Sequence, residues 1–315
     1  MNPLLEHLVV LPIVVPLFAG AAMLLLTEAQ RTARLTIALT SCTLQLATAL
    51  VLLYLRSDAA PFIWRNGIGV YTLGGWPAPY GMVLVADMLA AVMLTLEAVL
   101  GLAVVVYSIA RWDRPGQPFY SLLQFLLMGL NGAFLTGDLF NLFVFVEVML
   151  AASYGLLLHG SGAPRVKAGL HYIVVNLVAS LLFLIGVSLI YGVAGTLNMA
   201  DLAPRAAALA PSDRGVFDIG ATILGIAFLI KAASWPLNFW LPVAYAAAGA
   251  PVAAIFSLLT KAGVYAIIRV GSLLGESGAH LAFGQGREGI DVGQHQARLV
   301  ERTDQVLAGP GVDGG

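Results

Sequence analysis

The sequence predicts an all-α membrane protein, a polytopic bundle of about eight transmembrane helices in which the seventh is broken. Three observations carry this prediction. The chain of 315 residues is 59% hydrophobic and only 10% charged, whereas a soluble domain has about 25% charged residues. Its mean hydropathy is +0.89. Its apolar stretches are long enough to cross a hydrocarbon core of about 30 Å as helices, and short connections separate them.

The predicted spans follow one another along most of the chain. They lie near 4–26, 33–55, 82–110, 118–136, 138–158, 168–194, 216–235 and 250–272. The connections carry Gly, Pro, Asp and Arg, as the ends of spans do. The longest connection, 56–80, is rich in aromatic residues, Gly and Pro, which predicts an ordered cap at the membrane surface. Residues 198–210 predict a short surface helix that begins at Asn198.

The seventh span contains the signal for a break. The run LIKAASWPLNFWLPVAYAAAGAP (229–251) holds Pro236, Pro242 and Pro251. Proline removes a backbone donor and clashes with the preceding turn, so this run cannot be one regular helix. Broken helices are tolerated in lipid where they are buried or line a watery cavity, and transporters use them to bind ions. Lys231 lies beside the break, which favours a function over a simple kink.

The basic residues predict the orientation. Connections after the first, third and fifth spans hold Arg31, Arg34, Arg111, Arg114, Arg165 and Lys167. The opposite side holds Arg56, Arg65, Arg205, Arg214 and Arg269. Under the positive-inside rule, this bias places the N-terminus outside the cytoplasm. The expected location is the cell membrane, that is, the inner or plasma membrane.

Charges at mid-membrane depth are the main functional signal. A charge at the centre of a membrane helix costs about 2.5–3.5 kcal/mol, so such residues are usually functional. Glu147 lies about 14 Å beyond Asp138, at 1.5 Å per helical residue. Lys261 lies about 15 Å beyond Pro251 by the same measure. Lys231 and Lys261 are two of only three lysines in the chain.

These three residues allow two interpretations. A structural ion pair between Glu147 and a lysine would hold helices together. A relay would instead move protons. Burial away from water lowers the proton affinity of a lysine, and a nearby carboxylate raises it again. Three ionisable groups on three helices, with one lysine left unmatched, favour the relay: Glu147, Lys231 and Lys261.

Other polar residues are weaker candidates. Glu97, in the middle of the third span, is either a second pathway residue or a partner for a helix of another subunit. His171, about one turn into the sixth span, is a candidate proton stop, although an ordinary interfacial histidine explains it as well. We expect Asp87 to have an interfacial or structural role. We expect Asp138 to be a helix N-cap. Asn131, Asn176 and Ser180 would hold waters or bond to neighbouring helices.

Several function classes lack support. The net charge is −1, so the sequence lacks the excess of positive charge that is typical of nucleic-acid-binding proteins. The single cysteine, Cys42, excludes a disulfide framework and a cysteine-based metal site. Neither a metal cluster, a nucleophilic triad nor a phosphate-binding loop appears in the sequence. We therefore expect neither cofactor nor enzymatic chemistry of its own in this chain.

Three runs carry a resemblance to a known family. LGGWPAPYGMVLVAD (73–87), GDLFNLFVFVEVMLAASYGLLLHG (137–160) and LIKAASWPLNFWLPVAYAAAGAPVAAIFSLLTKAGVYAIIR (229–269) closely resemble the D subunit of the Mrp (Mnh or Pha) cation/proton antiporters. This family is related to the antiporter-like membrane subunits of respiratory complex I. The resemblance implies a functional glutamate in the fifth helix and lysines in the broken seventh and the eighth. These positions match Glu147, Lys231 and Lys261.

The resemblance implies a function and partners. Residues 1–275 would form a proton-translocating domain that exchanges a monovalent cation, with Na⁺ expected, for protons within a hetero-oligomeric membrane complex. The alternative is a proton-pumping subunit of an NADH-quinone oxidoreductase. Asn238 and Phe239 stand where complex I members usually show a histidine, which favours the Mrp side. A structural scaffold would explain the spans but not the midplane charges.

Two departures from the family pattern set further expectations. The family has about fourteen spans, and this chain resembles it only to about residue 275. Residues 276–315 are polar and Gly-rich without apolar periodicity, which predicts a disordered tail and a truncated or frame-shifted product. Glu97 stands where the family pattern predicts an apolar residue, so the resemblance assigns no role to it.

Overall fold

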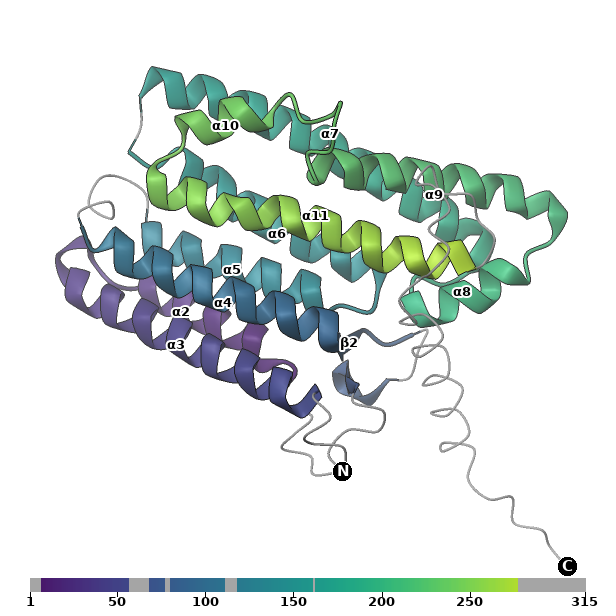
Figure 1. Ribbon diagram of the computed structural model, residues 1–315, viewed down its shortest axis with the longest axis horizontal. Coiled ribbons are helices and arrows are strands. Elements are labelled where there is room, and N and C mark those ends of the chain that lie inside the picture. The colour runs from purple at the N-terminus through teal and green to yellow at the C-terminus, as the bar shows by residue number, and fades with distance from the viewer. Residues whose placement is uncertain (1–6, 57–67, 77–79, 111–117, 161, 277–315) are drawn as a thin grey trace, which may run out of the picture.

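The computed structural model describes residues 7–56, 68–76, 80–110, 118–160 and 162–276. Within these residues the protein is a bundle of long helices that run roughly along one axis (Figure 1). A two-stranded hairpin and a short helix lie at one end of the bundle. The predicted disordered tail beyond Glu276 lies outside the described residues.

Eight long helices stand where the eight spans were predicted. They are α2 (Leu11–Leu24), α3 (Arg31–Arg56), α4 (Met88–Ser108), α5 (Phe119–Leu135), α6 (Leu139–Leu157), α7 (Ala163–Ala194), α9 (Pro211–Lys231) and α11 (Ala250–Glu276). Five of them (α3, α4, α6, α7 and α11) are long and apolar enough to cross a membrane, and α2 and α5 are shorter apolar helices. The predicted multi-pass helix bundle is therefore confirmed.

The third span begins differently from the prediction. Its first residues form strand β2 (Val83–Ala86), which pairs antiparallel with β1 (Gly69–Thr72). These residues form a strand rather than the first turn of the helix. All four residues of β2 are buried, and the pairing with β1 provides hydrogen-bond partners for their backbone groups. Helix α4 starts only at Met88, where Asp87 acts as N-cap and accepts a hydrogen bond from the Ala90 amide at 2.8 Å.

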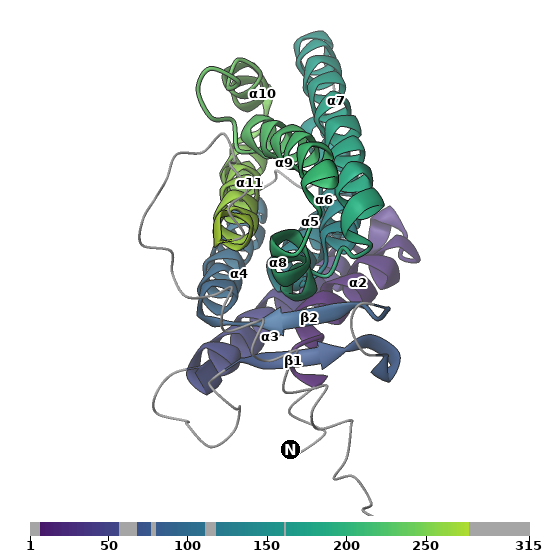
Figure 2. The same cartoon turned by 90° about the vertical axis from the view of Figure 1, so that its right-hand side faces the viewer.

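Helix α5 occupies the middle of the bundle. It packs on α2, α4 and α6, and nearly all of its side chains are buried. The end-on view shows α2 and α3 on one side, and α7 and α9 together on the other (Figure 2). Helix α11 lies between these two groups and packs on α4 and α9. The long helices therefore surround a core in which α5 and α6 are neighbours.

The seventh span is broken as predicted. Helix α9 ends at Lys231, and a short helix α10 (Leu241–Ala247) follows a stretch of turns before α11 begins. The predicted surface helix is α8 (Met199–Ala207). Its N-cap Asn198 accepts hydrogen bonds from the amides of the following turn. Both features agree with the sequence because prolines and cap residues determine them locally.

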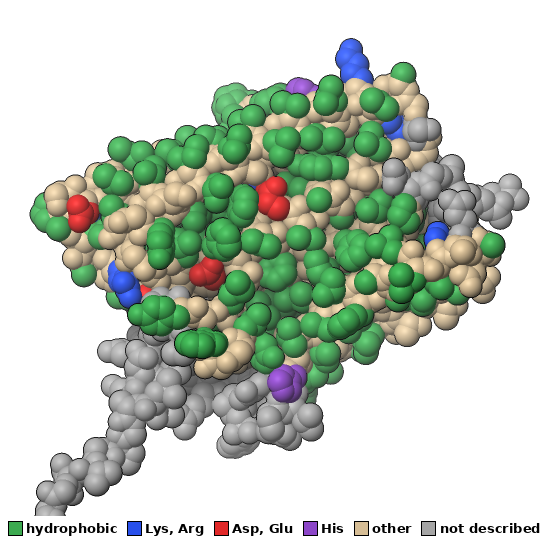
Figure 3. All heavy atoms as spheres, turned by 180° about the vertical axis from the view of Figure 1, so that it is seen from behind, with side chains coloured by type: hydrophobic (Ala, Val, Ile, Leu, Met, Phe, Trp, Pro, Cys, Tyr) green, Lys and Arg blue, Asp and Glu red, His purple; other side chains and the backbone are tan. Residues whose placement is uncertain are grey.

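The outer surface of the bundle is apolar. Hydrophobic side chains cover most of the face seen from behind (Figure 3). On α7 the exposed side chains include Leu170, Val174, Leu177, Val178 and Leu181. Contiguous apolar surface of this kind is costly in water and suits contact with lipid. The protein is therefore a multi-pass membrane protein.

Candidate functional site

Helix α6 positions Glu147 near the middle of the bundle. The helix starts at an N-cap, Asp138, whose Oδ1 accepts hydrogen bonds from two backbone amides at 2.9 Å. It packs very closely on α5, because a Cβ atom at Gly129 would lie only 2.7 Å from the Met149 nitrogen. A Cβ atom at Gly132 would likewise overlap with the Phe145 ring. These contacts fix the helical turn that carries Glu147.

Lys231 is the last residue of α9, beside the break. The indole Nε1 of Trp240 donates a hydrogen bond to the carbonyl of Ile230 at 3.1 Å, in addition to the bond that this carbonyl accepts from the Ala233 amide at 3.1 Å. Helix α11 passes against the break, since a Cβ atom at Gly263 would overlap with the Ala232 nitrogen. The backbone around Lys231 is therefore held by both neighbours.

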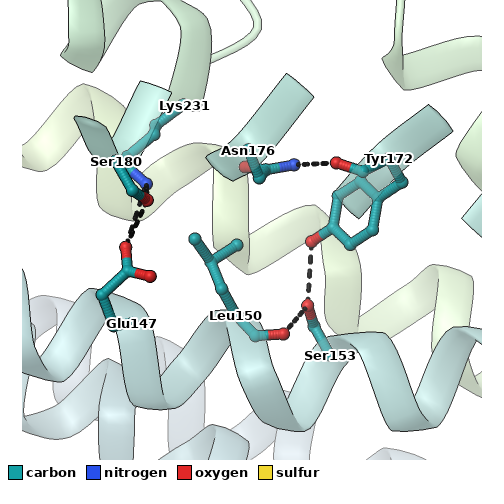
Figure 4. A network of polar contacts seen from close by, with 7 residues as sticks. All are labelled: Glu147, Leu150, Ser153, Tyr172, Asn176, Ser180 and Lys231. Atoms are coloured by element: carbon teal, nitrogen blue, oxygen red, sulfur yellow. Dashed lines mark hydrogen bonds and ion pairs between the residues drawn. The ribbon is translucent and has the colours of Figure 1, made fainter. Parts of the chain in front are cut away.

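Ser180 of α7 connects the two charged side chains (Figure 4). The Nζ atom of Lys231 donates a hydrogen bond to Ser180 Oγ at 3.0 Å. The Ser180 hydroxyl in turn donates a short hydrogen bond to Glu147 Oε1. Lys231 Nζ and Glu147 Oε1 lie 3.7 Å apart, which makes them an ion pair. Three helices thus contribute one residue each to a single cluster.

The two charges differ in burial. The Lys231 side chain is 7% exposed and the Glu147 side chain 30% exposed. Attraction between opposite charges is strong where water is excluded, and each would be costly without the other. The sequence allowed an ion pair between Glu147 and a lysine, and the structure shows that this lysine is Lys231. Ser180, for which the sequence left open water binding or a bond to a neighbouring helix, bridges the pair.

A second polar network lies next to this cluster on the same face of α7. Tyr172, Asn176 and Ser180 are spaced four residues apart and therefore line one face of the helix. The hydroxyls of Tyr172 and Ser153 are hydrogen-bonded at 2.9 Å, and Ser153 also donates to the carbonyl of Leu150 at 2.6 Å (Figure 4). Asn176 donates to the carbonyl of Tyr172 at 3.0 Å. The polar face of α7 thus continues beyond Ser180.

Lys261 does not join the pair. Its side chain is exposed, and among the described residues it has neither a hydrogen bond nor an ion pair. The geometry of α11 explains this position. Gly263 faces the break beside Lys231. Lys261 precedes Gly263 by two residues, which corresponds to a rotation of about 200° around the helix at 3.6 residues per turn. The Lys261 side chain therefore points to roughly the opposite side of α11. The structure therefore separates Lys261 from Glu147 and Lys231.

The two weaker candidates lie in different surroundings. His171 is exposed, and its ring contacts Phe239 of the broken segment edge to face at 6.0 Å between centroids. Glu97 is fully buried within this chain, at 0% exposure. That burial disfavours the expectation that Glu97 meets a helix of another subunit. Within the part of the chain that is described, groups of three or more His, Cys, Asp or Glu side chains suited to a metal do not occur.

Sequence reasoning missed one buried ion pair. Arg269 of α11 is 2% exposed and forms a short contact with the Asp87 carboxylate at the start of α4. In the sequence, Arg269 stands near the end of a span and was counted with the basic residues of one membrane face. The available signal was the position of Asp87, an N-cap at the same end of the bundle as the last turns of α11.

Comparison with known proteins agrees with this geometry. Residues 136–282 match the family described as NADH:quinone oxidoreductase/Mrp antiporter, transmembrane. The chain is 55% identical over 293 residues to the D subunit of a probable K⁺/H⁺ antiporter of Rhizobium meliloti, covering 93% of this chain and 54% of that relative. It is 42% identical to the D subunit of the Na⁺/H⁺ antiporter of Alkalihalophilus pseudofirmus, covering 86% of this chain and 53% of the relative.

A solved structure shows the same fold. The Mrp complex from Dietzia sp. contains a chain that superposes with a TM-score of 0.77 at 35% identity, covering 86% of this chain and 49% of that one. The fold is thus the antiporter-like fold of the NADH:quinone oxidoreductase/Mrp type. The chain is homologous to the D subunit of the Mrp antiporters, and it spans about half the length of the relatives that it matches. These relatives are transporter components rather than enzymes.

Proposed function

We propose that this chain provides part of the proton path of a monovalent cation/proton antiporter. The observation that carries the proposal is the ion pair of Glu147 and Lys231 bridged by the Ser180 hydroxyl. A carboxylate and an ammonium group joined through one hydroxyl at mid-bundle can exchange a proton without a large movement. Ionisable groups within membrane spans commonly mark such paths.

The proton transfer balances within the cluster. Lys231 gives a proton to Ser180 Oγ while the Ser180 hydroxyl gives its own proton to Glu147. The products are a neutral amine and a neutral carboxylic acid, and Ser180 is unchanged. A charge that approaches or leaves the cluster shifts the balance between the charged and the neutral pair, because electrostatic interactions are strong where water is scarce. This coupling is the property that an antiporter requires.

The remaining residues have proposed places around this pair. Lys261, on the exposed side of α11, would receive the proton at the next stage of the path, as its match to the family lysine implies. His171 would serve as a proton stop on the side of the broken segment. Residues 1–275 would act together as the translocating domain, with protons and a monovalent cation such as Na⁺ or K⁺ as the transported ions.

The proposed setting is a hetero-oligomeric complex in the cell membrane. The relatives of this chain are named as subunits of Na⁺/H⁺ or K⁺/H⁺ antiporters. These names support a similar assembly for this chain. We further propose that the N-terminus lies outside the cytoplasm, as the distribution of basic residues indicates.

A second candidate function is proton pumping within a respiratory complex. The matched family includes NADH:quinone oxidoreductase subunits as well as Mrp antiporters, and the same ion pair would serve either machine. The two functions differ in their partners. Co-purification with small membrane subunits would support the antiporter, and co-purification with flavin or iron–sulfur subunits would support the respiratory complex.

Ion exchange in membrane vesicles tests the proposed function. Everted vesicles from an antiporter-deficient host would contain this chain with the other subunits of an Mrp-type antiporter. Addition of Na⁺ or K⁺ should dissipate a preformed pH gradient, and vesicles without this chain should not respond. Equal responses with and without the chain, at confirmed abundance of the other subunits, would contradict the proposal.

A further inference from the structure

A fully buried carboxyl lies on the other side of the bundle from Glu147. Glu97 of α4 is 0% exposed, and neither of its carboxyl oxygens has a hydrogen-bond partner among the described residues. Buried polar groups nearly always have partners, and each exception calls for an explanation. A carboxyl that served only to join helices would donate or accept a bond, so its lack of one points away from a structural role.

Helix α3, which carries Cys42, packs along α4, the helix of Glu97. Arg31 at the start of α3 donates to the carbonyl of Ile109 just beyond α4, at 3.0 Å, and the two helices run in opposite directions.

Cys42 belongs to a buried polar cluster between α3 and α5. Gln124 donates to the Cys42 sulfur at 3.3 Å and accepts from Ser41 at 2.8 Å. Gln45 donates to Gln124 at 3.1 Å and accepts from Asn131 at 3.1 Å. All five side chains are buried. Gln124 and Asn131 are two turns apart on α5, so the cluster extends over about 10 Å of depth.

Asn131 connects this cluster to the level of Glu97. A Cβ atom at Gly101 would lie 3.1 Å from the side chain of Leu127 on the antiparallel α5. One turn further, Glu97 and Asn131 come to the same level. The Oδ1 atom of Asn131 is also buried without a partner in the described part of the chain. An acceptor without a donor and a carboxyl without a partner therefore lie in the same layer.

Glu97 and Glu147 stand at the same depth on opposite sides of α5. Gly129 of α5 packs against the turn of α6 that carries Glu147, and Asn131, two residues on, is level with Glu97. The charged groups around Glu97 are few. Helix α11 also packs on α4, but Lys261 is exposed and Arg269 is paired with Asp87. Neither cation reaches Glu97, because that carboxyl has no ion pair within the described residues.

From these positions we infer a second proton-binding site at Glu97, which exchanges its proton with solvent through the buried polar cluster of Ser41, Cys42, Gln45, Gln124 and Asn131. Without a cation beside it, a fully buried carboxyl is held in its neutral, protonated form, because the ionised form would lose its hydration. The site is independent of the Glu147–Lys231 pair and does not rest on the antiport proposal.

Infrared spectroscopy of the purified chain in lipid tests this site. A protonated buried carboxyl gives a C=O stretching band apart from the amide bands, and exchange into D₂O moves it to lower frequency. We expect this band in the native chain, its loss in Glu97→Gln, and its retention in Glu147→Gln. The Asn131→Leu variant should slow the D₂O shift, because it interrupts the polar cluster.

Two spectroscopic results would overturn the inference. A band that Glu97→Gln leaves unchanged means that Glu97 is ionised or is not its source. A Glu97 band that does not shift in D₂O means a sealed structural acid. If Glu97→Gln fails to fold, the native chain is treated with dicyclohexylcarbodiimide, which adds to protonated carboxyls in apolar surroundings. A mass-mapped adduct on Glu97 that declines as pH rises is expected; adducts only elsewhere would refute the site.

Discussion

Lys231 Nζ lies 3.7 Å from Glu147 Oε1, and Lys231 is also the residue at which α9 ends. The broken helix therefore delivers its terminal side chain directly to the carboxylate of α6. A continuous helix would carry the chain past this point with all its carbonyls satisfied. Ending the helix here places a lysine in its last turn, where Trp240 adds a hydrogen bond to the Ile230 carbonyl and α11 packs against the Ala232 backbone.

Ser180 should control the rate of proton transfer rather than the fold. In Ser180→Ala the direct pair of Glu147 and Lys231 remains, but the bridging hydroxyl is lost. We expect cation-dependent proton exchange in vesicles to fall about 10²-fold, at the lower end of the contribution of a positioned proton-transfer group. Ser180→Thr keeps a hydroxyl and should retain much of the activity.

A matched control exists two turns along the same helix. Ser188 donates only to the carbonyl of Leu184 and is exposed, so Ser188→Ala should leave exchange unchanged. Equal rates for native chain and Ser180→Ala, at equal abundance in the membrane, would show that the hydroxyl is not part of the path.

Lys261 should need to lose its proton during the cycle. Arginine keeps the positive charge, but it does not deprotonate in proteins. We therefore expect Lys261→Arg to assemble normally and to lose cation-dependent exchange, as Lys261→Ala also does. The assay is dissipation of a pH gradient in vesicles, with a blot for subunit abundance. If the arginine variant restores exchange that the alanine variant lacks, Lys261 acts only as a fixed cation.

Removal of one partner from the buried pair of Asp87 and Arg269 should strongly destabilise the fold. Arg269→Leu leaves the Asp87 carboxylate buried without its cation, which costs about 3–5 kcal/mol. The double variant Asp87→Asn with Arg269→Leu should be less destabilised than Arg269→Leu, because the uncompensated charge is gone. Thermal unfolding in detergent measures these differences.

Arg205 and Asp201 provide the comparison for that experiment. They form an ion pair at 2.8 Å on α8, where the arginine side chain is 43% exposed. Arg205→Leu should therefore cost less than about 1 kcal/mol. Similar losses for Arg205→Leu and Arg269→Leu would mean that burial does not determine the contribution of the Asp87 pair.

The orientation of the chain can be tested with two introduced cysteines. Cys42 is the single native cysteine and is buried, so Cys42→Ala provides the background. Ser212 lies in the first turn of α9, and Ala163 starts α7 at the opposite end of the bundle. Both are exposed. A membrane-impermeant maleimide added to intact cells should label Ser212→Cys and not Ala163→Cys. The reverse pattern would place the N-terminus in the cytoplasm.

Much of the fold follows from local signals in the sequence. Spans were predicted from apolar length, the break after Lys231 from its prolines, and two caps from Asp138 and Asn198. The importance of Glu147 and Lys231 was predicted from the cost of a charge at the centre of a membrane helix. In each case the residue itself, or its nearest neighbours in sequence, carries the information.

Other features depend on which helix faces meet, and the sequence does not give that directly. The residues of β2 are apolar, so the sequence predicts them as the start of a span. They form a strand because they pair with β1. Lys261 lies at the expected depth but on the exposed side of α11. Arg269 reads as a surface residue until α11 is packed against the start of α4. Ser180 becomes informative only once α7 lies between α6 and α9.

The most direct test of the central claim is the behaviour of Glu147→Gln in everted vesicles. Glutamine keeps the shape and can still bond to Ser180, but it cannot take a proton from Lys231. Its control is Asp201→Asn on α8, which also removes one carboxylate charge from a pair away from the site. Cation-induced dissipation of the pH gradient should be lost in Glu147→Gln and preserved in Asp201→Asn, with equal subunit abundance in both. Exchange at the native rate in Glu147→Gln would contradict the account and leave the Glu147–Lys231 pair as a structural contact.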